Sequence, residues 1–249
     1  MSEIQSLARG LKILAILAES EDGIGITDLA LQLSVDKGSA SRLIQTLAHY
    51  GYAEKGSDNR RYYLGPQVVT LSRSLLTRMP LRDTAKPYLH QLVEQSGECA
   101  HLAVLAQQKV LYIDQVESPA TLRVNAEVGS MAPLHCTALG KALLAFSSLD
   151  LPTELPSFTP RTITNPDLLR VNLEITRSQG YAVDDEEYDT GVRCIAVPVY
   201  DFRSKVVGAI GISGPAARMT IERIPLLAKT ILEIGRSLSD RMSFKRSTS

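Results

Sequence analysis

The chain has 249 residues, of which 44% are hydrophobic, and its 27 basic and 27 acidic side chains give a formal net charge of zero. That length and that hydrophobic content suffice for two modest domains with ordinary cores. The balanced charge excludes a chain-wide basic surface, so DNA binding would depend on a local patch and on the pairing of two such patches.

Other global features point to a soluble protein without disulfide bonds. The sequence has no apolar run long enough to cross a membrane and no segment that resembles a secretory signal. Its three cysteines, Cys99, Cys136 and Cys194, are few and odd in number. We therefore expect a cytoplasmic protein that makes no contact with a membrane.

The first predicted element is a helix near the N-terminus. Ile4, Leu7, Leu11, Leu14 and Ala18 recur at helical spacing and form one apolar stripe. We expect this stripe to close a small hydrophobic core.

Two further helices are predicted across a short polar break. Thr27 can cap the first, and the second, over residues 37–50, is apolar on one face and small, polar and cationic on the other. This pattern is typical of a helix-turn-helix that enters the major groove, where Arg and Gln read base edges and Ser and Lys hold phosphates. The residues predicted to contact DNA are Lys37, Ser39, Ser41, Arg42 and Gln45. Alone, these residues leave open any two-helix hairpin with a solvated face.

A strand hairpin is predicted directly after these helices. Residues 52–55 and 61–64 are strand-like and are joined by the polar turn 56–60. A helix-turn-helix followed by a basic-tipped hairpin is the pattern of a winged helix, and Arg60 and Arg61 stand where a wing would touch the phosphate backbone. Residues 1–65 are therefore predicted to form a winged helix-turn-helix domain.

A connector helix is predicted over residues 66–80. Pro66 is suited to its first turn, and Met79-Pro80 marks its end. Its apolar positions are Val68, Leu71, Leu75 and Leu76. Either this stripe forms a dimer contact, or it packs only on its own subunit.

Residues 81–249 are predicted to form a larger α+β domain, an antiparallel sheet flanked by helices. Short connections between strands imply antiparallel pairing. The predicted strands are 99–106, 110–116, 121–128, 181–184, 194–200 and 206–213. The predicted helices are 81–96, 137–146, one that starts at Asn165 and ends at Gly180, and a final one that carries Leu227 to Leu238, while 151–160 is a loop and 245–249 a frayed tail.

Three segments of this domain are expected to converge on a ligand site. Strand alternation places Cys194, Gly211 and Ser213 on one sheet face. The helix that starts at Thr137 offers free amides and the positive end of its dipole, which together suit a carboxylate. The third segment is the acidic run that begins at Asp184.

Six stretches carry a resemblance to a known family. In the DNA-binding region they are QSLARGLKILAIL, ITDLALQLSVDKGSASRLIQTL and RRYYLG, and further on PLHCTALGKALLA, GYAVDDEEYDTGVRCIAVPV and GAIGISGPAARMT. Over nearly its whole length the chain resembles the IclR family of bacterial transcriptional regulators. The resemblance implies a winged helix-turn-helix domain, a connector helix and a C-terminal GAF-like effector-binding domain. It also implies a dimer contact through the connector.

The resemblance also implies a set of effector-binding residues. With Thr137 added from the helix start, they are Val124, Ala132, Thr137, Ala138, Leu139, Asp184, Val192, Cys194, Gly211 and Ser213. Gly211 stands where some relatives that bind very small carboxylates have serine, which favours a larger ligand, whereas Leu139 replaces a smaller residue and favours a smaller one. The identity of the ligand does not follow.

The sequence therefore predicts a transcriptional regulator and not an enzyme. Its expected partners are double-stranded operator DNA, a small organic acid as effector, and itself, as a homodimer or a dimer of dimers. Catalysis is not expected, since the chain has no phosphate loop, glycine elbow or two-histidine motif, and no cofactor is expected. The alternative is a metal-responsive regulator that uses His101, His135, Cys136 and Asp184.

Overall fold

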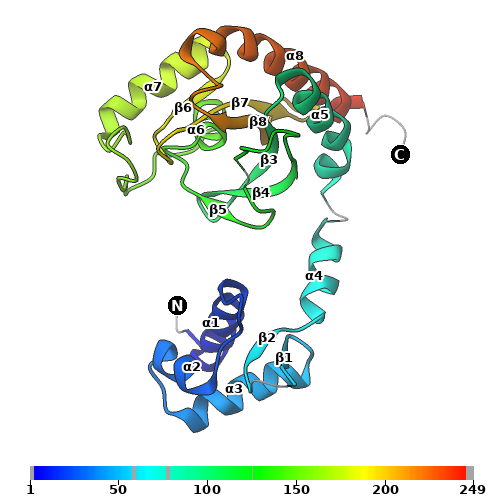
Figure 1. Cartoon of the computed structure of the whole chain (residues 1–249), viewed down its shortest axis with the longest axis vertical. Helices are drawn as coiled ribbons and strands as arrows, with labels where there is room; N and C mark the ends of the chain where they lie inside the picture. The colour runs from blue at the N-terminus through cyan, green and yellow to red at the C-terminus, as the bar shows by residue number, and fades with distance from the viewer. Residues whose placement is uncertain (1–2, 58–59, 77–78, 125, 245–249) are drawn as a thin grey trace. The chain divides into compact units, whose positions relative to one another are not determined.

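The structure is a computed structural model that describes residues 3–57, 60–76, 79–124 and 126–244. It divides into two compact units, Met1–Met79 and Pro80–Ser249, each described by itself below. Figure 1 labels their helices and strands.

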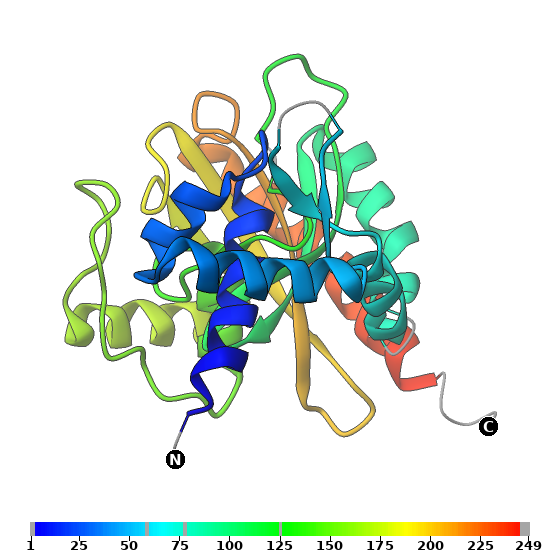
Figure 2. The same ribbon diagram turned by 90° about the horizontal axis from the view of Figure 1, so that it is seen from below.

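The N-terminal unit is a bundle of helices followed by a two-stranded hairpin. Its elements are α1 (Gln5–Glu19), α2 (Ile26–Leu33), α3 (Lys37–His49), β1 (Ala53–Lys55), β2 (Tyr62–Leu64) and α4 (Gln67–Leu76). α3 lies across α1 (Figure 2) and also packs on α2. Ile24, in the segment before α2, forms an isolated antiparallel bridge to Tyr62 of the hairpin. The predicted order of helices and hairpin is confirmed; Asp58 and Asn59 of the predicted turn lie outside the described residues.

The predicted packing face of the first helix is wrong. The buried residues of α1 are Ile13, Ile16 and Leu17, which join Leu29 and Ile44 in the core. The predicted stripe points outward instead: the exposed fractions are 67% for Ile4 and 60% each for Leu7 and Leu11. α1 thus has two apolar faces, and the unit buries only one of them.

The caps of α2 and α3 depend on local backbone geometry. Gly25, not Thr27, is the N-cap of α2, so the predicted Thr27 cap is wrong. Ser34 then adopts a left-handed conformation with φ 54°, which ends α2 and makes the tight turn. Asp36 caps α3 by accepting a hydrogen bond from the Ser39 amide at 2.9 Å.

The C-terminal unit is a six-stranded sheet with the order β5-β4-β3-β8-β7-β6, antiparallel throughout. Its strands are β3 (Cys99–Ala106), β4 (Lys109–Val116), β5 (Met131–Ala132), β6 (Ala182–Asp185), β7 (Val192–Tyr200) and β8 (Val206–Pro215). Its helices are α5 (Pro80–Ser96), α6 (Ala138–Phe146), α7 (Pro166–Gln179), the 3-10 turn η1 (Ile221–Arg223) and α8 (Ile224–Phe244).

Helices cover the two faces of the sheet in separate layers. α5 and α8 pack together on one face, while α6 packs on the other and is itself covered by α7 (Figure 1). Val197 points toward α8, where it would meet any side chain added at Gly235. Cys194 and Ala196 belong to the cluster around α6. The predicted alternation of faces along this strand is therefore confirmed.

One predicted strand is absent and one was missed. The described residues of 121–128 form bends and turns rather than a strand; Asn125 lies outside them. The edge of the sheet is instead the short β5, in which Ala132 pairs with Val110. Residues 77–78 of the predicted connector and the predicted tail at 245–249 also lie outside the described residues.

A long loop, residues 147–165, joins α6 to α7 without a helix or strand of its own. Two of its side chains tie it to the turn that follows β6. The Thr159 hydroxyl donates to the Glu186 carbonyl at 2.7 Å, and the Thr162 hydroxyl to the Glu187 carbonyl at 2.6 Å. The loop is therefore fastened to the turn 186–189.

Candidate functional site

The polar face of α3 is exposed. Lys37, Arg42 and Gln45 are exposed, and Ser39 and Ser41 are half-buried. Within this face Arg42 donates to the Ser39 hydroxyl at 3.3 Å, and Gln45 to the Ser41 hydroxyl at 3.1 Å. The face therefore presents one guanidinium and one carboxamide, each hydrogen-bonded to a neighbouring hydroxyl.

An acidic side chain, Asp36, caps the start of α3. The Ser39 hydroxyl donates to the Asp36 carboxylate at 2.7 Å, and the Ser39 amide donates to the same group. These hydrogen bonds lower the pKa of Asp36, so the carboxylate is ionised at neutral pH. The Ser39 amide is consequently engaged inside the chain.

The two arginines of the hairpin differ in their surroundings. Arg60 is exposed and has a left-handed backbone with φ 54°. Arg61 instead donates from Nη1 to the Gly23 carbonyl at 2.9 Å, across the hairpin to the loop between α1 and α2. Arg61 therefore fastens the hairpin to the helices, a contact that the sequence did not reveal.

The C-terminal unit contains a cavity of about 80 Å³ between the sheet and the first turn of α6. One water molecule needs roughly 10–15 Å³ of such space, so the cavity accommodates a small organic molecule. The lining residues are His101, Tyr112, Val124, Ala126, Thr137, Ala138, Leu139, Asp184, Tyr188, Asp189, Val192, Cys194, Ile195, Gly211, Ile212 and Ser213.

The start of α6 forms one wall of the cavity. Thr137 is its N-cap and accepts a hydrogen bond from the Gly140 amide at 3.1 Å. Ala138 and Leu139 follow with first-turn amides that have no carbonyl partner inside the helix. A side chain at Gly140 would overlap the carbonyl oxygen of Leu134, so glycine is required for the preceding segment to fold back over the helix.

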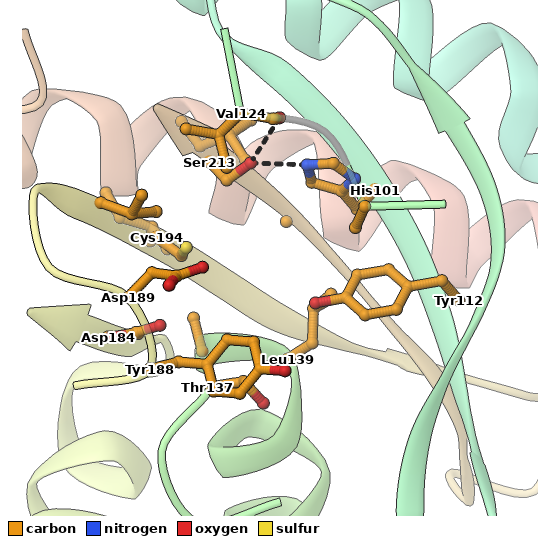
Figure 3. A pocket seen from close by; sticks show the side chains of 16 residues that line it. His101, Tyr112, Val124, Thr137, Leu139, Asp184, Tyr188, Asp189, Cys194 and Ser213 are labelled. Atoms are coloured by element: carbon orange, nitrogen blue, oxygen red, sulfur yellow. Dashed lines mark hydrogen bonds between the residues drawn. The ribbon is translucent and has the colours of Figure 1, made fainter. Parts of the chain in front are cut away.

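The opposite wall holds a buried histidine. His101 Nε2 is 2.6 Å from the Ser213 hydroxyl, which also lies 3.3 Å from the Val124 carbonyl (Figure 3). Burial lowers the pKa of His101 to about 4, so its imidazole is neutral at physiological pH. Among the described residues, its Nδ1 has no hydrogen-bond partner.

A third wall is acidic and comes from β6 and the turn after it. Asp184 is buried and accepts a hydrogen bond from the Glu187 amide at 2.8 Å. Burial raises the pKa of Asp184 to about 7, against backbone hydrogen bonds that favour the ionised form. Tyr188 and Asp189 lie beside Asp184 in Figure 3.

A buried ion pair lies behind this wall. Lys141 of α6 is fully buried and donates to the Glu187 carboxylate. The second carboxylate oxygen of Glu187 has no hydrogen-bond partner within the described part of the chain. The pair connects the helix that forms one wall of the cavity to the turn that forms another.

Most of the predicted effector residues come together in this cavity. Val124, Thr137, Ala138, Leu139, Asp184, Val192, Cys194, Gly211 and Ser213 line it. Ala132 does not: it is buried in β5 in the cluster around α6. The lining residues that the prediction omitted are His101, Tyr112, Ala126, Tyr188, Asp189, Ile195 and Ile212. Alternation along β3 would have placed His101 on this face, had its pairing with Gly211 been known.

The four candidate metal ligands are not gathered. His135 is hydrogen-bonded to the Pro156 carbonyl at 3.0 Å and, like Cys136, does not line the cavity that holds His101 and Asp184. Throughout the described ranges, no three His, Cys, Asp or Glu side chains are grouped as a metal ion would require. No helix in those ranges is long and apolar enough to span a membrane.

Comparison with known proteins gives a consistent result. Residues 6–57 match the family model described as the IclR helix-turn-helix domain, and residues 73–240 match that of the bacterial transcriptional regulator IclR C-terminal domain. The chain is 38% identical to a glycerol operon regulatory protein of Streptomyces coelicolor over 95% of each chain.

Two solved structures are similar over nearly their whole length. An IclR transcriptional regulator from Alicyclobacillus acidocaldarius has a TM-score of 0.81 at 26% identity and covers 97% of this chain and 100% of its own. An IclR homolog from Microbacterium hydrocarbonoxydans, complexed with 4-hydroxybenzoate, has a TM-score of 0.82 at 22% identity and covers 95% of this chain and 98% of its own.

Proposed function

The chain belongs to the IclR family of bacterial transcriptional regulators, which are not enzymes, and on this premise we propose how it acts. α3 binds operator DNA in the cytoplasm, and a small organic acid in the cavity of the C-terminal unit controls that binding. The observation that carries the proposal is the pairing of an exposed polar helix face with a cavity lined by nine of the predicted effector residues. An effector that binds one form of the protein more tightly shifts its DNA-competent population.

The DNA contact rests on the side chains of α3. Because the Ser39 amide is engaged by Asp36, phosphate binding depends on Lys37 and on the exposed Arg60 rather than on that amide. Arg42 and Gln45 have the donor geometry that reads guanine and adenine edges. Arg61 ties the hairpin to the loop between α1 and α2 through the Gly23 carbonyl.

Arg42→Ala tests this contact. We expect operator affinity to fall about 5- to 150-fold at constant salt, with relaxed preference at one base position, because a bidentate base contact contributes about 1–3 kcal/mol. Lys37→Ala, by contrast, should weaken binding to all sequences alike. Unchanged operator binding by the Arg42→Ala protein would contradict the proposed role.

The second copy of the chain is proposed to pack on the outward stripe of α1. Ile4, Leu7 and Leu11 are exposed there, and Val69 and Leu71 are exposed on α4. A contiguous apolar stripe of this kind favours a protein partner, and a palindromic operator requires two DNA-binding units. Leu11→Glu should yield monomers in sedimentation experiments, whereas Leu31→Glu, at an exposed leucine of α2, should not.

The effector is proposed to bind with its carboxylate at the first turn of α6. The Ala138 and Leu139 amides and the helix dipole favour an anion there. The Microbacterium homolog was solved with 4-hydroxybenzoate, an aromatic carboxylate. In this chain Tyr112 and Tyr188 supply aromatic surface to the same cavity.

A thermal-shift screen of the full chain against metabolic carboxylates, with and without chelator, tests the effector. A ligand that binds only the native state raises the unfolding midpoint with concentration. Ser213→Phe should abolish the shift and leave unliganded operator binding intact. A shift with metal ions alone would contradict the organic effector and favour the metal-responsive alternative.

A further inference from the structure

The cavity poses an electrostatic problem for an organic acid. Its described lining contains no lysine or arginine but two carboxyl groups, Asp184 and Asp189. The nearest buried cation, Lys141, is already paired with Glu187. An ionised ligand would therefore meet negative charge on the acidic wall formed by β6 and the turn after it.

Asp184 would repel an anionic ligand more strongly than Asp189, because Asp184 is buried whereas Asp189 is exposed to screening by water. The Asp184 carboxyl holds the turn through the Glu187 amide and lies across from Cys194 on the neighbouring strand, whose thiol is hydrogen-bonded to it. Figure 3 shows Asp184, Asp189 and Cys194 on the same side of the cavity.

The competing electrostatic effects can be compared as changes in affinity. If the ligand carboxylate and Asp184 were both ionised about 4 Å apart, their repulsion at an effective dielectric constant near 20 would lower ligand affinity about a thousandfold. The N-terminus of a helix raises the affinity for one anion by about 30-fold at most. The helix start alone therefore does not compensate for a second ionised carboxylate in the cavity.

We infer that a monocarboxylate effector binds together with one proton, which Asp184 takes from solvent and donates in a hydrogen bond to the ligand carboxylate. The oxygen of Asp184 that does not hold the Glu187 amide is the one protonated. Ligand and Asp184 then carry a single negative charge, and the α6 amides stabilise it. This inference rests on the proposed binding of a carboxylate in the cavity.

The groups that face Asp184 come from four elements. They are Glu187, Tyr188 and Asp189 of the turn, Cys194 of β7, Lys141 and Cys136 at α6, and Tyr112 of β4. Burial raises the pKa of Cys136 to about 12 and also raises the pKa values of Cys194 and Tyr112. Glu187 also has a raised pKa through burial but is paired with Lys141. The pKa of His101, near 4, lies below the range from pH 6 to 8.5. Between pH 6 and 8.5 the proton taken up with the ligand therefore belongs to Asp184, whose burial places its pKa near 7.

The test is calorimetric titration of the full chain with 4-hydroxybenzoate, pyruvate and lactate at pH 6.0, 7.0 and 8.5, in buffers of different ionisation enthalpy. A group with a pKa near 7 that must be protonated to bind weakens binding about 30-fold between pH 6 and 8.5. About one proton should be taken up per ligand at pH 8.5. Asp184→Asn should bind with no proton uptake and little pH dependence, because its amide donates without titrating.

Two controls keep the result interpretable. Asp189→Asn removes the exposed carboxylate and should retain the proton uptake. The primary amide of a probe that binds, such as 4-hydroxybenzamide, should bind the unmodified chain with no uptake, which tests the inference even if Asp184→Asn fails to fold. Carboxylate binding without pH dependence or proton uptake would overturn the inference and leave the proposed function standing. Failure of all three acids to bind at every pH would overturn both.

Discussion

Replacing Lys141 with methionine should strongly destabilise the C-terminal unit. The Lys141 side chain is fully buried and Glu187 is 5% exposed, so the substitution leaves a carboxylate in the interior without its cation. Breaking a buried ion pair from one side typically costs about 3–5 kcal/mol. Substituting both residues by methionine removes both charges and should restore most of that stability.

Differential scanning calorimetry of the full chain measures this effect. For a unit the size of Pro80–Ser249, each kcal/mol lowers the unfolding midpoint by roughly 2–4 °C, so Lys141→Met should lower it by roughly 6–20 °C. The loss should grow with pH. Burial raises the folded-state pKa of Glu187, and without Lys141 it rises further, so the folded state binds a proton that the unfolded state has released at higher pH.

The double-mutant cycle decides whether this reasoning holds. A loss below about 1 kcal/mol for Lys141→Met would show that Glu187 finds other compensation. A Lys141→Met, Glu187→Met chain as unstable as the sum of the two single variants would show no coupling between them. Either result would refute the account of the pair as mutually dependent.

Three further perturbations test other parts of the structure. Gly140→Ala should cost about 1–3 kcal/mol in calorimetry, because its methyl group would overlap the Leu134 carbonyl; a neutral effect would contradict the close approach. The pKa of His101 is about 4 in the folded chain, so between pH 6.5 and 4 the imidazole is protonated in the unfolded state but not in the folded state. The free energy of unfolding should therefore fall by up to about 3 kcal/mol as pH drops from 6.5 to 4. A His101→Gln chain should lack this component in acid titrations. Arg61→Ala should loosen the hairpin, which hydrogen exchange at the Tyr62 amide would report as faster exchange; unchanged exchange would show that the Gly23 contact does not hold the hairpin.

The sequence predicted elements well where one periodic pattern dominated. The polar and apolar faces of α3 and the alternation along β7 both follow from local spacing, and Ala40, Ile44 and Cys194 lie where that spacing puts them. The prediction of the buried face of α1 failed because this helix carries two apolar stripes, and residue spacing does not decide which stripe faces the core of its own chain. Ile13 and Ile16 form the buried one.

Other parts of the site depended on pairings between distant segments. His101 enters the cavity because β3 pairs with β8, in a register that no local pattern encodes. The burial of Lys141 is possible only because Glu187, 46 residues away, meets it. The segment 121–128 has strand-like composition but no described neighbour to pair with, since β5 occupies the edge of β4.

The loop 147–165 has an evolutionary consequence. Thr159 and Thr162 fasten it to the turn that supplies Tyr188 and Asp189 to the cavity, although neither threonine lines the cavity itself. Insertions and deletions accumulate most readily in surface loops. A change in the length of this loop would move one wall of the cavity while every strand kept its sequence. New ligand preferences could thus arise in descendants of this chain by changes of loop length, without substitution of any residue that touches the ligand.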